Sequence, residues 1–428
     1  MENKFGSAKE IGLYPREEFE KNKWDKYNDL VTVNESQYSF GDDALQKDFS
    51  NSIVANYSDE QKEKYKFYRS EWYRRAKQFD HGSAPLAVTC ELVSTCNLGC
   101  SMCYTITEEF QDSVVGATRM LPWTIVKKVI DEASELGVYS MLFSWRGEST
   151  LYRVKDNDGN IKTFADVVKY ANEKNILETS CLTHGQLIDE KLAEVLVNSK
   201  LSWINYSIDG LENEYNKIRT PRNKKKDKSY NAFKVVTESI KTLTKVKKKL
   251  NSKTPQLRTN SIFPSIYKNP KEFADFMYSI GVNWVTVNEI LDFRFDEVAQ
   301  EEVKDNWACS YPFQRLTVSA NGTILPCTGA HNEEEGLVLG RYYGAPIKKV
   351  IKNYRKHELD YKEMNLKEAW DSKKLNEIRF LHQNNRRCEI NPGCQNCRHG
   401  MKKEGVTYVP DEWNIETMKW ENHTWRNG

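Results

Sequence analysis

The sequence lacks any run of about 18 apolar residues, the length that a membrane-spanning helix requires. Its first residues, from Met1 to Ser7, also lack the apolar stretch of a secretory signal peptide. An excess of one charge is missing as well, because 63 Lys and Arg residues balance 61 Asp and Glu residues to a net charge of +2. Such a balance gives no strong field for nucleic acid or an acidic membrane. We therefore expect a cytoplasmic protein with neither nucleic acid nor a membrane as its partner.

The chain is nevertheless long and apolar enough for a large fold. Its 428 residues suggest two or three domains, and 39% hydrophobic residues can build a real core. No obvious internal repeat is present. Ten cysteines in a cytosolic chain indicate metal ligands rather than disulfides.

Three of these cysteines, Cys96, Cys100 and Cys103, form a C-x3-C-x2-C loop. Three thiolates can hold three irons of a [4Fe–4S] cluster, which is normally bound by four, so the fourth iron keeps an open position. The loop follows an apolar run at residues 86–93 that predicts a strand. A zinc site is the alternative, although zinc prefers paired C-x2-C ligands.

The cysteine spacing resembles that of the radical S-adenosylmethionine (SAM) superfamily. The resemblance implies that the open iron chelates SAM. An electron from the cluster would then split SAM into methionine and a 5′-deoxyadenosyl radical, which abstracts hydrogen from a substrate. The resemblance also implies a low-potential electron donor such as flavodoxin or ferredoxin.

Strand and helix patterns alternate between residues 86 and 290, and helices are predicted at 124–136 and 164–174 among others. Alternating units of this kind imply a parallel sheet with right-handed crossovers. Six units are too few for a closed eight-stranded barrel. We expect an α/β fold with an open, TIM-like partial (β/α)6 barrel, the form that the superfamily uses. The six predicted strands are 86–93, 141–145, 178–182, 203–208, 256–262 and 284–287.

Further motifs follow these strands, at the carboxyl ends where ligands bind. Arg146-Gly147-Glu148 comes after the second strand and resembles the GGE-type motif of the superfamily. Glycine allows a close backbone approach, and the resemblance implies that Glu148 accepts hydrogen bonds from the amino group of SAM. Arg146 replaces the first glycine and is a candidate for contact with the cofactor or the substrate. A surface turn is the alternative reading.

Thr183-His184-Gly185 comes after the third strand and resembles the T-N-G segment near the SAM ribose. Thr183 is therefore a candidate cofactor contact, and His184 is expected to form structural hydrogen bonds. Cys181 lies two residues earlier, so its side chain points to the same side of the strand as that of Thr183. If that side is the barrel lumen, Cys181 is a candidate catalytic residue that returns a hydrogen atom to a substrate radical. A buried inert thiol is the alternative.

The fourth strand ends in Ser207-Ile208-Asp209-Gly210, with Arg219 nine residues later, and the set resembles an S-x-D-G pattern followed by arginine. The resemblance implies that Ser207 bonds the ribose or carboxylate of SAM and that Arg219 pairs with the carboxylate. Asp209 is a further cofactor candidate, with capping of the next helix as its alternative. On the fifth strand, one of Arg258 and Asn260 is expected to reach the lumen.

The C-terminal third carries a second set of cysteines. A hairpin at 316–325, turned at Asn321-Gly322, lies between Cys309 and Cys327 and brings them close together. A C-x2-C pair follows at Cys394 and Cys397, with Cys388 as a spare. The pattern resembles the twitch domain, a shortened SPASM extension, and implies one auxiliary [4Fe–4S] cluster held by Cys309, Cys327, Cys394 and Cys397. Structural zinc is the alternative. One helix is predicted from Leu366 through Arg379.

We expect four parts along the chain. They are an N-terminal extension at 1–85, a radical SAM partial barrel at 86–300, a SPASM- or twitch-like cluster domain at 301–400 and a tail at 401–428. In the extension, Ser58 and Gln61 predict a capping box at the start of a helix. That helix packs on the barrel or forms part of a substrate or partner surface.

The predicted activity is that of a radical SAM oxidoreductase or isomerase. We expect it to dehydrogenate or epimerise a carbohydrate-type small molecule. Crosslinking or epimerisation of a ribosomally made peptide is the second hypothesis, so the substrate partner is a small molecule or a peptide. A non-catalytic protein with two zinc sites is the third.

Overall fold

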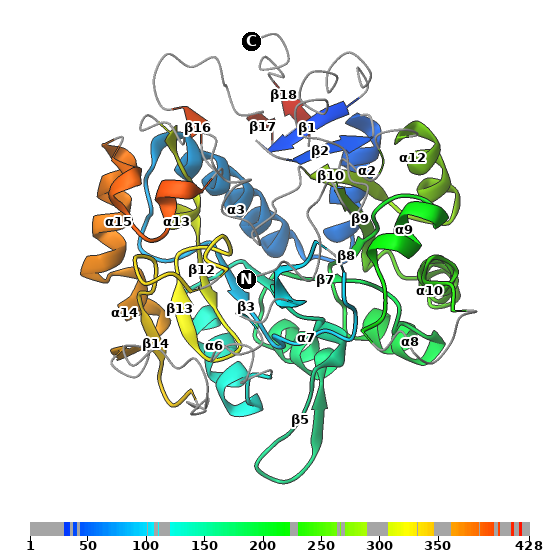
Figure 1. Cartoon of the computed structure of the whole chain (residues 1–428), viewed down its shortest axis with the longest axis horizontal. Coiled ribbons are helices and arrows are strands. Elements are labelled where there is room, and N and C mark those ends of the chain that lie inside the picture. The colour runs from blue at the N-terminus through cyan, green and yellow to red at the C-terminus, as the bar shows by residue number, and fades with distance from the viewer. Residues whose placement is uncertain are drawn as a thin grey trace, which may run out of the picture.

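Six parallel strands form the centre of the computed structural model (Figure 1). They lie side by side in chain order, and each neighbouring pair is parallel. The open partial barrel expected from the sequence is thus confirmed, strand for strand: β3 (Ala87–Cys90), β4 (Ser140–Leu142), β7 (Glu178–Thr183), β8 (Trp203–Ser207), β9 (Gln256–Ile262) and β10 (Trp284–Asn288).

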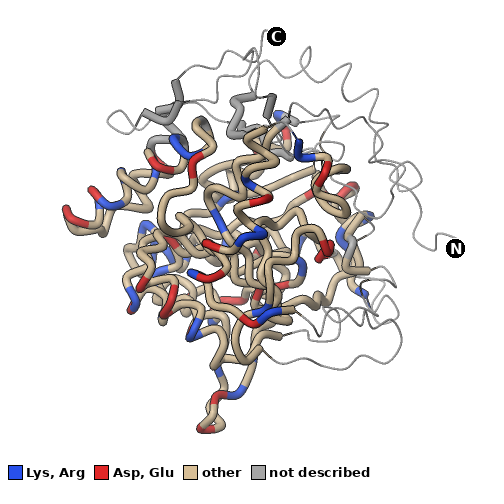
Figure 2. Tube along the Cα trace, turned by 90° about the vertical axis from the view of Figure 1, so that its left-hand side faces the viewer, with Lys and Arg blue, Asp and Glu red and all other residues tan. Residues whose placement is uncertain are grey.

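The structure describes the following residues: 30–34, 37–40, 43–100, 102–106, 110, 120–222, 230–262, 266, 270–288, 307–331, 333–345, 361–384, 386–397, 401–402, 412–414 and 419–421. Within them, no helix has the length and hydropathy that crossing a bilayer requires. Acidic and basic residues are interspersed along the traced elements (Figure 2), in keeping with the balanced composition.

Amphipathic helices cover the outer face of these strands. Residues on that face, such as Val88, Ile204 and Leu257, are fully buried in one core with the helices. Figure 1 shows α8, α10 and α12 on one side of the molecule. The predicted helices at 124–136 and 164–174 are α6 and α7. The helices between the strands are α6 (Trp123–Glu135), α7 (Phe164–Glu173), α8 (Glu190–Asn198), α9 (Glu212–Ile218), α10 (Ala232–Lys249) and α12 (Pro270–Ser279).

On β9, the inner face keeps partial contact with solvent towards its carboxyl end. Along β9, Leu257, Thr259 and Ser261 have no exposed surface, whereas Arg258, Asn260 and Ile262 are partly exposed. Because side chains alternate across a strand, the partly exposed set faces the barrel lumen. Both Arg258 and Asn260 therefore lie on the lumen face.

Cys181 lies on the opposite face from the one that its catalytic role required. It is in register with Ile204 of β8, and both residues are fully buried in the core under the helices. Its neighbours Ser180 and Leu182 alternate with it and face the lumen. Burial in this apolar core raises the pKa of the Cys181 thiol. Cys181 thus lies outside the lumen that the hydrogen-donor role requires, and its burial favours the alternative of an inert thiol.

Both edges of the parallel sheet are extended, which gives twelve strands in all. At the β10 edge, an antiparallel hairpin adds β2 (Gln37–Phe40) and then β1 (Leu30–Asn34). At the β3 edge, β12 (Arg315–Val318) pairs in parallel and continues into β13 (Thr323–Leu325), β14 (Gly340–Tyr342) and β15 (Glu363–Met364). The predicted hairpin is confirmed, and Gly322 in its turn has a φ of +86° that favours glycine.

The C-terminal helices lie at the opposite side of the molecule from α10 (Figure 1). They are α13 (Tyr311–Gln314), α14 (Leu366–Trp370) and α15 (Lys373–Gln383). The single helix expected from Leu366 was wrong, because Ser372 adopts φ −59° and ψ 144° and begins a new helix. Its side chain accepts a hydrogen bond from the backbone N–H of Leu375, an ordinary N-cap. Three short pairs complete the described strands: β5 (Arg153–Lys155) with β6 (Ile161–Thr163), β11 (Trp307–Ala308) with β16 (Met401–Lys402), and β17 (Glu412–Asn414) with β18 (Lys419–Glu421).

The N-terminal helices close the bottom of the barrel. They are α2 (Asp43–Ile53) and α3 (Asp59–Gln78). The predicted capping box is present, since Ser58 and Gln61 exchange side-chain to backbone hydrogen bonds. Tyr65 of α3 donates its hydroxyl to Glu178, the first residue of β7, at 3.0 Å. Tyr65 also packs in a cluster with Leu177 and Trp284, so this helix packs on the amino end of the barrel.

Candidate functional site

The cysteine loop follows β3 at the carboxyl end of the parallel strands. Its turn is closed by the Cys103 amide, which donates to the carbonyl of Cys100 at 2.9 Å. Burial and the neighbouring thiols raise the pKa of Cys96, and burial raises that of Cys100 to about 11 although Arg219 opposes the shift. Three thiols held together in a region of low polarity form a donor set suited to an iron–sulfur cluster.

A short segment after α9 holds this loop in place. Gly99 donates its amide to the carbonyl of Thr220 at 2.7 Å, and Leu98 forms a bridge with Pro221. The Arg222 guanidinium donates to the carbonyls of Leu98 and Thr105 at 3.0 and 3.2 Å. No local pattern pointed to Arg222, because its acceptors are carbonyls more than 100 positions away in the chain.

Gly147 is required by the approach of two backbone segments. A Cβ at this position would lie 2.3 Å from the carbonyl oxygen of Val93 and 2.6 Å from that of Thr95. The next amide, that of Glu148, donates to the Thr95 carbonyl at 2.9 Å. The R-G-E segment therefore lies directly against the chain that enters the cysteine loop, as the close-approach role of the glycine predicted.

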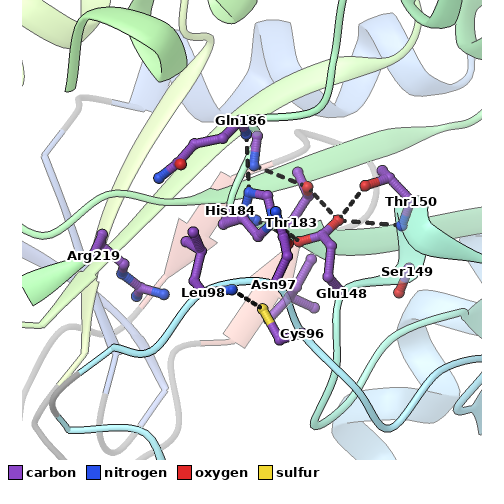
Figure 3. Close-up of polar contacts among 12 residues, drawn as sticks. Cys96, Asn97, Leu98, Glu148, Ser149, Thr150, Thr183, His184, Gln186 and Arg219 are labelled. Carbon is purple, nitrogen blue, oxygen red and sulfur yellow. Dashed lines mark hydrogen bonds and ion pairs between the residues drawn. The ribbon is translucent and has the colours of Figure 1, made fainter. Parts of the chain in front are cut away.

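The Glu148 carboxylate is buried and oriented by its neighbours (Figure 3). One oxygen accepts the hydroxyls of Thr150 and Thr183 at 2.6 and 2.7 Å. The other accepts the backbone N–H of His184 at 2.9 Å. Two of the predicted cofactor residues, Glu148 and Thr183, are thus in direct contact, and Thr183 acts on the site by orienting the carboxylate.

His184 connects this carboxylate to the cysteine loop (Figure 3). Its Nδ1 faces the amide of Gln186 at 2.9 Å, and an amide only donates, so Nδ1 is the accepting nitrogen. Nε2 then carries the hydrogen that it donates to the Asn97 side-chain oxygen at 2.8 Å. Burial lowers the pKa of His184, which keeps the ring neutral. The expected structural role of His184 is confirmed, whereas Asn97 had not been singled out.

Arg219 and Asp209 form a pair beside the cysteine loop. Arg219 donates from Nε to Asp209 at 2.6 Å and reaches the Cys100 sulfur with Nη1 at 3.7 Å. The other Asp209 oxygen accepts the amide of Ile262 at 2.9 Å. The capping alternative for Asp209 is wrong, because Leu211 is the N-cap of α9. Ser207 is partly exposed at the end of β8, on the lumen face.

Arg146, a candidate for contact with the cofactor or the substrate, is paired with two carboxylates. Its guanidinium donates to Glu91 at 2.9 and 2.6 Å and to Glu333 at 3.0 Å. The side chain is 1% exposed and stacks 3.8 Å from the ring centre of Trp145. We therefore do not retain Arg146 as a cofactor or substrate contact. Its ion pairs instead tie the R-G-E segment to the C-terminal part of the chain.

Four cysteines gather around one pocket in that C-terminal part. Cys309, Cys327, Cys394 and Cys397 line it, together with His382 and Arg387, while Cys388 is not among the lining residues. Burial raises the pKa of Cys327 to about 12, with a smaller contribution from Cys397. No three His, Cys, Asp or Glu side chains in the described ranges are grouped to hold a single metal ion. The four-thiol set is the one that an iron–sulfur cluster normally uses.

Two family models match the chain in these two regions. The model of the radical SAM superfamily matches residues 91–247, and that of an iron–sulfur cluster-binding domain, SPASM, matches residues 309–398. The chain contains a radical SAM domain followed by a SPASM domain. Its radical SAM domain uses a [4Fe–4S] cluster and SAM, and its SPASM domain binds auxiliary iron–sulfur clusters. The zinc alternative for both cysteine sets is thereby wrong.

Solved structures of other radical SAM proteins are similar to the chain at low sequence identity. BtrN in complex with AdoMet and 2-DOIA is 14% identical, with a TM-score of 0.41 over 76% of this chain and 98% of its own. A tagged anSMEcpe with bound AdoMet is 14% identical, with a TM-score of 0.48 over 80% and 90%. SuiB of Streptococcus suis bound to S-adenosylmethionine is 15% identical, with a TM-score of 0.43 over 83% and 78%. Among curated proteins, none matches the sequence.

Proposed function

We propose that this radical SAM protein abstracts hydrogen from a carbohydrate-type small molecule and thereby dehydrogenates or epimerises it. The observation that carries the proposal is that the cysteine loop, Glu148, Thr183 and Arg219 meet at the carboxyl ends of the strands. The lumen face beside them includes the polar residues Asn205, Ser207, Arg258 and Asn260. When bound, the reduced cluster and SAM supply a 5′-deoxyadenosyl radical. A polar lumen suits a hydroxylated substrate, because buried hydroxyl and amide groups need hydrogen-bond partners.

In this proposal each site residue has a defined task. Cys96, Cys100 and Cys103 hold the cluster. Glu148, already oriented by Thr183 and by the His184 amide, accepts the amino group of SAM. Charge-assisted hydrogen bonds of this kind are short and directional. Arg219 binds the SAM carboxylate and is held in position by Asp209, while Ser207 binds the ribose or carboxylate.

We further propose that the second cysteine set holds one auxiliary cluster that serves as electron acceptor. A radical on a carbinol carbon is strongly reducing. If that radical gave one electron to the cluster and its hydroxyl proton to solvent, a carbonyl would remain, and the substrate would have been oxidised by two electrons in total. A low-potential flavodoxin or ferredoxin is the proposed donor of the first electron. In an epimerisation, a hydrogen atom would instead return to the substrate carbon.

The first experiment asks whether the chemistry occurs and on which class of molecule. Anaerobically purified protein is analysed for iron and sulfide, reduced, and incubated with SAM while 5′-deoxyadenosine is measured. We expect sugars, aminocyclitols and sugar nucleotides, tested as a panel, to include a compound that increases this product above the unstimulated rate. Stimulation by peptides alone would contradict the proposed substrate class and favour peptide modification.

Replacement of one auxiliary ligand separates SAM cleavage from turnover. We expect Cys394→Ala to keep unstimulated 5′-deoxyadenosine formation within roughly twofold of wild type but to lose oxidised product. The reason is that Cys394 lines the second pocket, away from the first cysteine loop. Product analysis by mass spectrometry checks this, with Cys388→Ala as the matched control that keeps the pocket complete. An unchanged product yield in Cys394→Ala would rule out the electron-acceptor role.

A further inference from the structure

Arg258 is a cation inside the barrel. It lies on the lumen face of β9, in register with Asn205 of β8 and with Trp284 of β10. The guanidinium lies 5.9 Å from the ring centre of Trp203 and 5.5 Å from that of Trp284. Arg258 is partly exposed. Helices cover the other face of β9 and strands lie on both sides of it, so the exposed part of Arg258 faces the lumen.

The polar contacts of Arg258 do not balance its charge. Nε donates to the hydroxyl of Thr286 at 3.1 Å. Nη2 is buried without a hydrogen-bond partner, and Arg258 forms no ion pair with any of the described residues. Burial alone lowers the pKa of Arg258, to about 10, with no carboxylate opposing the shift. A buried charge is costly unless an opposite charge and hydrogen bonds compensate for it.

Neighbouring strands present further groups without partners on the same face. Asn205 of β8 has a buried side-chain oxygen with no donor, and Ser180 of β7 has a buried hydroxyl with no partner. Both positions belong to the lumen set by the register of β7, β8 and β9. Other buried side-chain atoms of the described residues also lack partners, but those of Ser180, Asn205 and Arg258 gather on adjacent strands of one face. Because buried polar atoms usually have partners, this grouping favours a polar molecule bound against that face.

We propose that Arg258 binds an anionic group of the substrate, a carboxylate or a phosphate, within the barrel lumen. Asn205 accepts a hydrogen bond from a hydroxyl of the same molecule, and the Ser180 hydroxyl offers a further hydrogen bond on the same face. The substrate class is then an acidic hydroxylated molecule, such as a uronate or a sugar phosphate. This inference rests on the proposed function and narrows its substrate.

Thermal unfolding with matched probes tests the site directly. Reconstituted wild-type protein with SAM is heated with sodium D-glucuronate, glucose 6-phosphate or D-glucose at constant ionic strength. We expect one of the two anions to raise the melting temperature by about 2–4 °C over D-glucose, and Arg258→Gln to lose that rise. A response to glucuronate alone identifies a carboxylate, and a response to glucose 6-phosphate alone identifies a phosphate.

Two results would overturn the proposal. One is that neither anion raises the melting temperature more than D-glucose does. The other is an equal rise in Arg258→Gln, which would place the binding elsewhere, for example at the lysines that end α10.

A second pair of variants distinguishes an anion site from a structural arginine. Arg379 is the matched comparison, because it too has a buried Nη2 without a partner and a pKa lowered by burial. It differs from Arg258 in that the rest of its guanidinium donates to the carbonyls of Pro312 and Trp370 and stacks on Trp370. Without any anion present, we expect Arg258→Met to melt at or above the wild-type temperature, since an uncompensated charge is removed. Arg379→Met should melt several degrees lower. An equal loss of stability in both variants would show that Arg258 is structural and would end the proposal.

Failure of this inference and failure of the proposed function can be told apart. Formation of 5′-deoxyadenosine by reduced wild-type protein is measured without any probe. If no 5′-deoxyadenosine forms, the proposed function is wrong even if anions bind at Arg258. The presence of 5′-deoxyadenosine, without any anion response, would leave radical chemistry intact and remove only the anion site.

An independent observation concerns His382, which lines the second cysteine pocket and is fully buried. Its Nδ1 receives the backbone N–H of Cys309 at 3.1 Å, so Nδ1 is the accepting nitrogen. Nε2 must then carry the hydrogen, and it lies 3.6 Å from the sulfur of Cys394. We infer that His382 is a positioning residue that donates an N–H···S hydrogen bond to the Cys394 thiolate and raises the reduction potential of the auxiliary cluster.

Redox titration of the auxiliary cluster tests this role. The cluster is observed alone by EPR in full-length protein in which Cys96, Cys100 and Cys103 are changed to alanine. We expect His382→Phe to shift the midpoint to lower potential at unchanged iron content, and His382→Gln, which keeps an N–H donor, to recover part of the shift. An unchanged midpoint in His382→Phe would overturn the inference. If that variant fails to bind iron, the absence of an exchangeable proton coupling in the EPR spectrum of the His382-containing protein would overturn it instead.

Discussion

Replacement of Cys100 by serine is expected to reduce 5′-deoxyadenosine formation to the background of protein-free reactions. Cys100 is 5% exposed and lies between Cys96 and Cys103, with Arg219 directed at its sulfur. A hydroxyl is a poor ligand for cluster iron, so two thiolates would remain for a cluster that needs three from this loop. The iron content should fall by about four atoms per chain, which leaves the auxiliary cluster.

Cys181→Ala provides the matched control for this experiment. Cys181 is also buried, with no exposed surface, but it faces the helices and lies away from the lumen. We expect this variant to keep its iron and its SAM cleavage, because it removes only one small group from the core. Full iron content and activity in Cys100→Ser would refute the proposed ligand set. Loss of hydrogen transfer in Cys181→Ala would contradict its placement outside the lumen.

Gly147→Ala is expected to be the most disruptive single methyl addition near the site. The new Cβ would lie 2.3 Å from the Val93 carbonyl and within 3 Å of the Thr95 backbone, and neither can rotate away. Overpacking of this kind costs roughly 3 kcal/mol of folding free energy. It also pushes Glu148, the next residue, away from Thr95. Urea unfolding should therefore show lower stability, and equilibrium dialysis should show loss of SAM binding.

Gly99→Ala is the control for the glycine prediction, because a Cβ there meets its nearest atom, in the Arg222 side chain, at 3.5 Å. This is an ordinary van der Waals contact, so we expect nearly wild-type stability and SAM binding. If Gly147→Ala were as stable as Gly99→Ala and bound SAM equally well, the close approach of the two segments would be wrong.

Much of the fold follows from local sequence patterns. Alternating apolar runs predicted all six barrel strands, and the Ser58–Gln61 pattern predicted the capping box of α3. The break at Ser372 was not predicted, because the apolar spacing continues through it and only the cap reveals the second helix. Local hydrogen bonds and side-chain periodicity are encoded within a few residues, which is why these features can be predicted.

The candidate site also has parts that the sequence predicted and parts that it did not. Its ligand types and their spacing are contiguous, so the two cysteine sets and the R-G-E and T-H-G segments could be recognised. The partners of those segments are distant in sequence. Asn97 meets His184 across 87 positions, and Arg146 meets Glu333 across 187. No local signal identified Asn97, Glu333 or His382 as part of the site.

The sequence by itself determined which side chains share a strand face, because that depends only on the two-residue period of a strand. Only the tertiary structure decided which face became the lumen. Helix packing placed Cys181 in the outer core, and strand register placed Arg258 inside the barrel. The contacts of Arg146 were likewise decided by the tertiary structure, since Glu91 and Glu333 neutralise its charge where its side chain is 1% exposed.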